Sequence, residues 1–362
     1  MPTTDPTEAG HWLRLALIPG ISPGTLRTLL TEFGSPERVL AASGPALRKL
    51  VASEIAAAIA DGGNAQSAQA ALAWLAEPDN HIVTLADADY PQLLLQTADP
   101  PPLLYVKGRL DLLNRPALAI VGSRNASAQG SDNATQFARA LSAAGITIVS
   151  GLALGIDAAA HRGGLTGVGS SIALVGTGLD VVYPARNKTL AHELAAKGAL
   201  VSEFPLGTPP LAANFPRRNR LISGMSLGCL VVEAALQSGS LITARFANEQ
   251  GREVFALPGS IHSPLAKGCH ALIKQGAKLV DDANDILDEL KLPARSKPAR
   301  ESPELDGAEA SVLDHLGHSP CALDVLCSRA QVGAAEAAGL LLKLELKGLV
   351  ESLPGGRYQR VR

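Results

Sequence analysis

The sequence predicts an α/β protein built around a doubly wound, Rossmann-like parallel sheet. Between residues 116 and 290, short apolar runs alternate with segments of helical spacing. The runs are continuous and do not alternate with polar residues, as expected of parallel strands that are covered on both faces. The 35 glycines suit the many strand-to-helix turns of such a fold. Strands are expected at 117–121, 146–150, 171–175, 199–203, 229–233, 253–256 and 278–280.

Residues 1–75 are predicted to form a small helical domain of the SAM or helix–hairpin–helix type. Apolar residues such as Trp12, Leu15 and Leu26 recur there at helical spacing. The turn at 18–22, Ile-Pro-Gly-Ile-Ser, resembles the hairpin whose backbone amides hold a DNA phosphate in such modules. Serine stands where those hairpins usually have their second glycine.

The extended Rossmann-like domain is predicted over residues 76–290. It opens at 82–106 with a short strand, a turn and three consecutive prolines, a pattern typical of an edge strand or a connector. Further along, a helix is expected at 131–144, because Phe137 and Leu141 fall on one of its sides.

A polar, proline-bearing linker at 291–304 separates this domain from a predicted winged helix at 305–362. The third helix of that domain is rich in Ala, Glu and Leu, whereas a helix that reads the major groove needs cations and base-reading side chains. We therefore expect an accessory or docking domain that single-strand binding does not require. Its helices are expected near 308–316, 321–329 and 333–347, followed by a hairpin over 349–361.

The bulk composition limits the class of protein. A net charge of −2 excludes a polycation, so a nucleic acid would have to bind at a local patch. The start lacks the segments of a signal peptide, and no apolar run approaches the ~20 residues that span a bilayer, so we expect a cytoplasmic protein without membrane partners. None of the four cysteines forms a Cys-x-x-Cys pair, and we expect free thiols, no disulfide and no metal.

Ligands of doubly wound sheets collect at the carboxyl ends of the strands, and these ends carry polar residues here. Gly122 would let the backbone approach a phosphate, Ser123 can donate a hydrogen bond, and Arg124 can clamp the anion. The needs of tight turns alone would explain Gly122 and Gly151, but not Arg124. The other strand ends carry Ser150-Gly151, Gly176-Thr177-Gly178 and Glu203.

Residues 214–220 hold three arginines, two asparagines and a phenylalanine. Because Pro216 suits the first turn of a helix, we expect a loop that leads into a helix, with free N–H groups and a dipole that attract phosphate. The arginines would add phosphate contacts, and Phe215 would stack on an unpaired base. A solvated basic turn with Phe215 packed inward fits the residue types equally well. The side chains concerned are Asn214, Phe215, Arg217, Arg218, Asn219 and Arg220.

Two patterns invite an enzymatic interpretation. Asp157 and His161 lie four residues apart and could form an acid–base couple, but structural roles are favoured because no nucleophile or second carboxylate stands nearby. Gly176-x-Gly178 follows a strand, yet Val181 replaces the third glycine of a dinucleotide fingerprint. No Walker lysine pattern is present in the sequence. We therefore expect no NAD site and no other cofactor.

Six motifs follow one another over roughly residues 80–290. They are Gly-Ser-Arg at 122–124, Ser-Gly-Leu-Ala-Leu-Gly-Ile-Asp with a later His at 150–161, Gly-Thr-Gly-Leu-Asp-Val-Val-Tyr-Pro at 176–184, Phe-Pro-Arg-Arg-Asn-Arg at 215–220, Ser-Gly-Ser-Leu-Ile-Thr-Ala at 238–244 and Gly-Arg-Glu-Val-Phe-Ala-Leu-Pro-Gly at 251–259. In this order they resemble the DNA-processing protein A family (DprA, also called Smf).

The resemblance implies a non-enzymatic protein of natural transformation that binds incoming single-stranded DNA, protects it and loads the RecA recombinase onto it. It also implies self-association through the Rossmann-like domain, for which His270, Ile273 and Leu279 border the last strand; packing under their own sheet is the alternative for Ile273 and Leu279. Matched by motif, the DNA pocket would comprise Gly122, Ser123, Arg124, Ser150, Gly151, residues 214–220, Gly239 and Ser240.

The competing class is enzymatic. Nucleotide phosphoribohydrolases of the cytokinin-activating type use the same fold and carry Pro-Gly-Gly-x-Gly-Thr-x-x-Glu at the active site. Residues 239–243 lack that pattern, and Glu233 precedes the loop.

Overall fold

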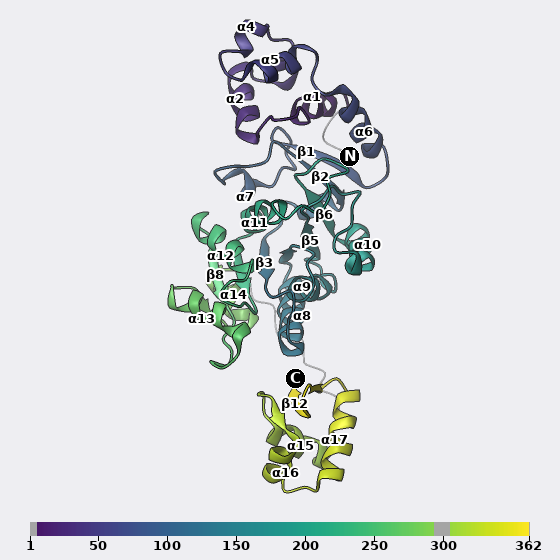
Figure 1. Cartoon of the computed structure of the whole chain (residues 1–362), viewed down its shortest axis with the longest axis vertical. Coiled ribbons are helices and arrows are strands. Elements are labelled where there is room, and N and C mark those ends of the chain that lie inside the picture. The colour runs from purple at the N-terminus through teal and green to yellow at the C-terminus, as the bar shows by residue number, and fades with distance from the viewer. Residues whose placement is uncertain (1–5, 293–304, 362) are drawn as a thin grey trace.

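The computed structural model describes residues 6–292 and 305–361, and its centre is a nine-stranded sheet (Figure 1). The strand order is β1-β2-β6-β5-β4-β3-β7-β8-β9, in which β3 to β9 run parallel and β1 and β2 are antiparallel additions at one edge. The doubly wound fold is confirmed, and all seven predicted strands are present with slightly different ends. The strands are β1 (Asn80–Thr84), β2 (Leu103–Gly108), β3 (Ala117–Val121), β4 (Thr147–Ser150), β5 (Ser171–Leu174), β6 (Ala199–Ser202), β7 (Gly228–Val231), β8 (Glu253–Ala256) and β9 (Lys278–Leu279).

Helices cover both faces of this sheet. Within β3, Ile120 packs with the helices of one face and Val121 with those of the other, which explains why the strands read as unbroken apolar runs. One face carries α8 (Ala128–Ala143), α9 (Ile156–Gly164), α10 (Lys188–Lys197) and α14 (Ala283–Glu289), and the other carries α7 (Gln92–Leu95), α11 (Asn214–Gly224), α12 (Ser240–Glu249) and α13 (Lys267–Lys274). Short 3-10 turns lie at Leu110–Leu112, Ala185–Asn187 and Pro264–Ala266.

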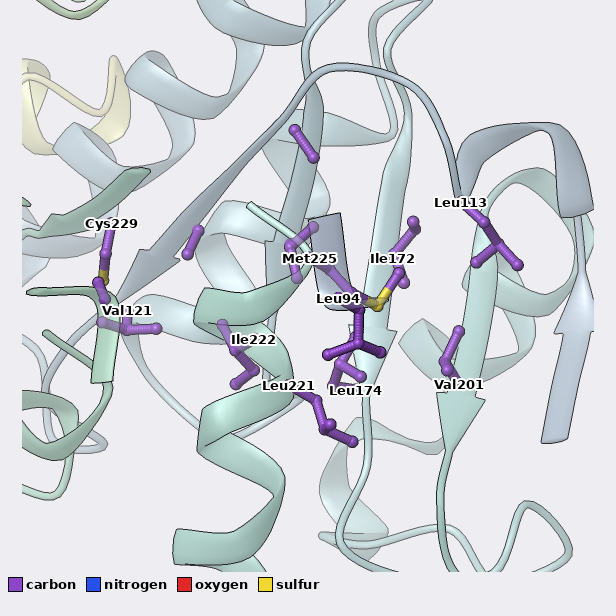
Figure 2. Close-up of a cluster of buried hydrophobic side chains, with 14 of the residues drawn as sticks. Leu94, Leu113, Val121, Ile172, Leu174, Val201, Leu221, Ile222, Met225 and Cys229 are labelled. Atoms are coloured by element: carbon purple, nitrogen blue, oxygen red, sulfur yellow. The ribbon is translucent and has the colours of Figure 1, made fainter. Parts of the chain in front are cut away.

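Helix α11 connects β6 to β7 and contains the predicted arginine cluster. Its residues Leu221 and Ile222 are buried against the sheet, beside strand residues such as Val121 (Figure 2). Burying a leucine or isoleucine side chain contributes about 1.5–3 kcal/mol, so these two residues fix the rotation of the helix about its axis. Asn214 and Arg218 precede Ile222 by eight and four residues, and they therefore share its inward side.

The strand order reverses between β3 and β7, and the loops after these two strands are tied together. The backbone N–H of Ser123 donates to the carbonyl of Glu233 at 2.7 Å. The Glu233 carboxylate in turn accepts hydrogen bonds from the Ser127 backbone N–H at 3.0 Å and the Ser127 hydroxyl at 2.5 Å. Glu233 therefore anchors the start of α8 beside the crevice where doubly wound folds bind ligands.

The N-terminal part is helical, as predicted. Ser22 ends the turn at 18–22 and caps the second helix, since its hydroxyl accepts a hydrogen bond from the Thr25 backbone N–H at 3.0 Å. Figure 1 shows these helices packed beyond the β1 edge of the sheet. They are α1 (Pro6–Ala16), α2 (Pro23–Phe33), α3 (Pro36–Leu40), α4 (Gly44–Leu47), α5 (Ser53–Ala60) and α6 (Ala65–Leu75).

The C-terminal residues form the predicted winged helix, with a core of its own. Lys343 lies in the third helix of this domain, and Lys347 follows directly after it. Lys347 pairs with Glu309 at 2.6 Å, so it is not available for a partner. Most of the predicted linker, residues 293–304, lies outside the described residues. The elements are α15 (Gly307–Leu316), β10 (Cys321–Ala322), α16 (Leu323–Ala330), α17 (Ala334–Leu346), β11 (Val350–Leu353) and β12 (Arg357–Arg360).

Within residues 6–292 and 305–361, no single helix has both the length and the apolar composition needed to cross a membrane; α16 and α17 pass that test only as a pair, bent by 103°. All four cysteines are free thiols. In the same described residues, no group of three or more His, Cys, Asp or Glu side chains is placed to hold a metal ion.

Candidate nucleic-acid interface

The three arginines of residues 214–220 do not form one patch. Helix α11 begins at Asn214, so these residues lie in the helix itself, and the loop that leads into it ends at residue 213. Successive helical residues are about 100° apart, which sends neighbouring side chains in different directions. Arg218 points into the protein, whereas Arg217 and Arg220 point toward Glu203.

Arg218, predicted as a phosphate contact, is buried and bonded inside the protein. Its guanidinium donates to the backbone carbonyl of Gly151 at 2.5 Å and to that of Leu174. Burial lowers the pKa of Arg218 to about 10, with Asp157 acting in the opposite direction, so the side chain stays charged at neutral pH. Gly151 is required here because a Cβ at this position would lie 2.7 Å from the Arg218 guanidinium.

Asp157 and His161 hold the turn after β4, as the structural interpretation predicted. Leu152 adopts a left-handed backbone conformation with φ 57°, which needs external support. The Asp157 carboxylate accepts a hydrogen bond from Gly151 N at 3.1 Å, and His161 Nε2 accepts one from Leu152 N at 3.2 Å. His161 Nδ1 then donates to the Ser171 hydroxyl at 2.8 Å. Burial lowers the pKa of His161 to about 3, so the ring is neutral and fully used in this network.

Arg220 and Arg217 share a buried carboxylate. Arg220 is largely enclosed, donating to the Glu203 carboxylate and to the carbonyl of Asp99, so it ties α11 to the segment before β2. Arg217 lies 3.5 Å from the same Glu203 oxygen, but its side chain is 53% exposed and its guanidinium sits 5.3 Å from the Phe204 ring centre. Of the three arginines, Arg217 is therefore the one with a guanidinium open to solvent.

An exposed aromatic pair lies beside these arginines. The rings of Phe215 and Tyr183 are 5.5 Å apart and tilted by 37°, and the Arg124 guanidinium is 5.8 Å from the centre of the Phe215 ring. Tyr183 is 44% exposed, whereas Phe215 is of intermediate burial, so its ring is neither fully packed inward nor fully in solvent. Gly176 makes room for the Phe215 ring, since a Cβ there would lie 3.0 Å from it. Two loops and the start of α11 thus meet in one cationic, aromatic group of Arg124, Tyr183 and Phe215, which we call the aromatic cluster.

Several predicted pocket residues support the site from inside. The Ser150 hydroxyl is buried and donates to the carbonyl of Ile120 at 2.6 Å, and the Asn214 amide donates to the carbonyl of Gly176 at 3.1 Å. At Gly122 a Cβ would lie 2.6 Å from the Ile156 side chain, so protein packing, and not ligand approach, accounts for this glycine.

A second cluster of predicted residues lies at the start of α12. The Asn219 amide donates to the carbonyl of Gly239 at 3.4 Å, and its oxygen accepts from the Arg218 Nε at 3.2 Å. Ser240 is buried and shares a 2.7 Å hydrogen bond with Ser238. The space where a Gly239 side chain would project is open, so the start of α12 is accessible at this position.

Tyr183 was not among the predicted site residues. The signal for it in the sequence is an aromatic residue in the loop after β5, directly before Pro184, in a chain where aromatic residues make up only 3%. In the sequence that dipeptide had no predicted role beyond its place in the motif at 176–184. The structure instead places Tyr183 in the aromatic cluster.

The protein has a doubly wound sheet and an appended winged helix. Arginine and aromatic side chains are grouped at the strand ends of the sheet. These features define an α/β protein that presents a cationic and aromatic ligand surface. The chain belongs to the family of DNA recombination-mediator protein A, whose family model matches residues 81–291. The model of the DprA winged helix domain matches residues 296–356. The family resemblance seen in the motifs is confirmed.

Relatives with known names and structures agree with this assignment. The chain is 46% identical over 306 residues to Protein Smf of Escherichia coli (strain K12), covering 82% of each chain. It is similar to the X-ray structure of DNA processing protein A from Streptococcus pneumoniae, with a TM-score of 0.68, 36% identity, and coverage of 80% of this chain and 99% of that one. It is also similar to DNA processing protein A from Helicobacter pylori, described for its unique single-stranded DNA binding mode, with a TM-score of 0.53, 31% identity, and coverage of 58% and 95%.

Proposed function

We propose that the protein binds single-stranded DNA at the aromatic cluster of Arg124, Tyr183 and Phe215. The observation that carries the proposal is the exposed ring of Tyr183 beside the partly exposed ring of Phe215, with a guanidinium next to them. Aromatic rings stack on bases of any sequence, but only when those bases are unpaired, and arginine adds phosphate contacts. Arg217, Asn219 and the open start of α12 would extend the site along α11. The description of the Helicobacter pylori relative as a single-strand binder supports the same ligand.

The biological role that fits this activity is DNA processing in natural transformation and recombination. In this proposal the protein protects the incoming single strand and loads the RecA recombinase onto it, in the cytoplasm. Membership of a family described as recombination mediators supports such a role.

The proposed activity is binding without catalysis. The Asp157 and His161 side chains, which could have formed an acid–base couple, are buried and engaged with the turn after β4. The alternative, a phosphoribohydrolase on the same fold, would need a free carboxylate beside residues 239–243, but Glu233 is bonded to Ser127. Incubation with nucleoside monophosphates tests this point, because release of free base would contradict a purely binding protein.

Oligonucleotide binding measured by fluorescence anisotropy across salt concentrations tests the main proposal. The wild type is expected to prefer a single strand over a duplex of the same sequence. Arg124→Ala removes one phosphate contact, so the slope of log K against log salt should become less negative by about 0.7. Arg139→Ala, which removes an exposed arginine from the far part of α8, serves as the matched control and should leave the slope unchanged. Equal slopes for both variants and the wild type would remove Arg124 from the site.

We also propose that the protein forms a homodimer through the β9 edge. Leu279 is 48% exposed on this edge strand, and His270 lies nearby with its ring bonded to the Gly259 carbonyl at 3.0 Å. Ile273 is partly buried against its own core and would contribute only its outer part. Exposed apolar side chains at a sheet edge suit an isologous contact, in which the same surface of both subunits meets.

Sedimentation at micromolar concentration is expected to show a dimer. Leu279→Glu should raise the dimer dissociation constant about tenfold or more, because a charge would face an apolar contact. Val168→Glu changes another exposed apolar residue, away from β9, and should leave the dimer intact. A monomeric wild type would disprove this assembly.

A further inference from the structure

A cavity of about 200 Å³ lies where the N-terminal helices meet the sheet. Its outer wall comes from the end of α1 and the turn at 18–22, through Ile21 and Ser22. Its inner wall comes from β2 and the loop after β6, through Tyr105 and Phe204. The turn that resembles a phosphate-holding hairpin therefore faces the main domain across this cavity.

Two polar atoms of the cavity-lining residues are buried without a partner. One is Oε1 of Glu203, whose side chain is only 2% exposed, and the other is the hydroxyl oxygen of Tyr105, which is fully buried. Arg217 and Arg220 both interact with the other Glu203 oxygen, Oε2, so they leave Oε1 unsatisfied. Buried acceptors are almost always hydrogen-bonded in native proteins, so the unpaired Glu203 oxygen behind the cavity lining indicates a donor that the protein does not supply.

The remaining walls suit a flat ring. Pro101, Pro102 and Pro205 line the cavity together with the Phe204 ring, which gives apolar faces around the carboxylate. Flipped nucleobases are held in this way, between apolar or aromatic side chains, with hydrogen bonds to their polar edge.

Arg217 lies on the same helix turn as Phe215 of the aromatic cluster and also lines the cavity. It lies over Phe204 and is two residues from Phe215 on α11. Because these two residues are about 200° apart around the helix, a single strand that stacks on Phe215 would have to cross the first turn of α11 to reach the cavity. Arg217 is placed to hold the phosphate of a nucleotide whose base turns inward.

We propose that this cavity receives one base of the bound strand and that Glu203 accepts a hydrogen bond from the exocyclic amine of that base. The inference rests on the proposed single-strand binding. Carboxylates recognise the amine of cytosine, and adenine and guanine also carry an exocyclic amine, whereas thymine has none. The protein should therefore bind cytosine-containing strands more tightly than thymine strands of equal length.

The test compares the affinities of the full-length protein for dT20 and dC20 at pH 7.5. The wild type should bind dC20 about ten- to 150-fold more tightly, the effect of one charge-assisted hydrogen bond. Glu203→Gln should bring that ratio close to one, because the oxygen that remains is held by the two arginines. Because Glu203 also pairs with two arginines, a second variant is needed. Ala16→Phe fills the cavity from α1 without touching the carboxylate, and it should abolish the preference in the same way.

Three other results of this comparison would overturn the cavity proposal or the proposed function. Equal wild-type affinities for the two strands would overturn the cavity proposal while leaving single-strand binding intact. A cytosine preference that survives in both variants would place base recognition elsewhere and would also overturn it. Failure to bind either strand would remove the proposed function itself, and the cavity proposal with it.

Discussion

Arg218→Ala is expected to lower the free energy of unfolding by about 3–5 kcal/mol, as the loss of a buried, engaged charge does in other proteins. The change leaves the carbonyls of Gly151 and Leu174 without their donor in the protein interior. It also removes the positive charge that offsets the burial of Asp157, whose pKa burial raises. Urea unfolding followed by circular dichroism at pH 7.5 measures the loss.

Arg217→Ala is the matched control, since it removes the adjacent arginine of the same helix. Arg217 is half exposed and makes one ion pair at 3.5 Å, so the cost should be below about 1 kcal/mol. The sequence alone suggested the opposite role for Arg218, namely a phosphate contact. An Arg218→Ala protein with wild-type stability and a weaker salt dependence of DNA binding would support that earlier interpretation against the structural one.

The residue pattern could not reveal which of the three arginines in α11 is buried. Arginine is rarely buried, so three arginines in four positions were all interpreted as surface cations. The information that separates them is the rotation of α11, which is fixed by Leu221 and Ile222 against the sheet. Residues four apart share a helix face, which carries Arg218 inward with Ile222 and leaves Arg217 outside.

The strands and the winged helix were predictable because their signals are local. Parallel strands covered on both faces give short apolar runs, and each predicted run is a strand of the sheet. The aromatic cluster is different, since Arg124, Tyr183 and Phe215 come from loops after β3 and β5 and from α11. No local pattern connects positions that are 91 and 32 residues apart, and only the sheet order brings them together.

The buried hydrogen bonds of α11 position the aromatic ring that this helix carries. Arg218 fixes α11 to the ends of β4 and β5, and Asn214 fixes the same helix to Gly176. Phe215 lies between these two anchors in the sequence, so its ring is held in place by its neighbours and not by its own burial. A rigid platform loses little conformational entropy when a base stacks on it.

Phe215→Ala is expected to weaken single-strand binding by about 1–3 kcal/mol, the usual range for losing a stacked base. This corresponds to about a 5- to 150-fold higher dissociation constant. Tyr183→Ala should have an effect in the same range, because its ring is exposed and lies 5.5 Å from that of Phe215. Anisotropy titrations with dT20, a strand without exocyclic amines, measure both effects independently of the cavity beside Glu203.

The two rings are expected to act together. If one base contacts both, the double variant should lose less than the sum of the two single losses, since neighbouring contacts are not additive. Phe215→Trp and Tyr183→Phe keep an aromatic ring and should retain most of the affinity, whereas Phe215→Leu keeps apolar bulk without the ring and should not. Thermal melting of each variant separates binding from folding, and the partial exposure of both rings predicts small changes there. A Phe215→Leu protein that binds dT20 as tightly as the wild type would show that the ring does not stack on DNA.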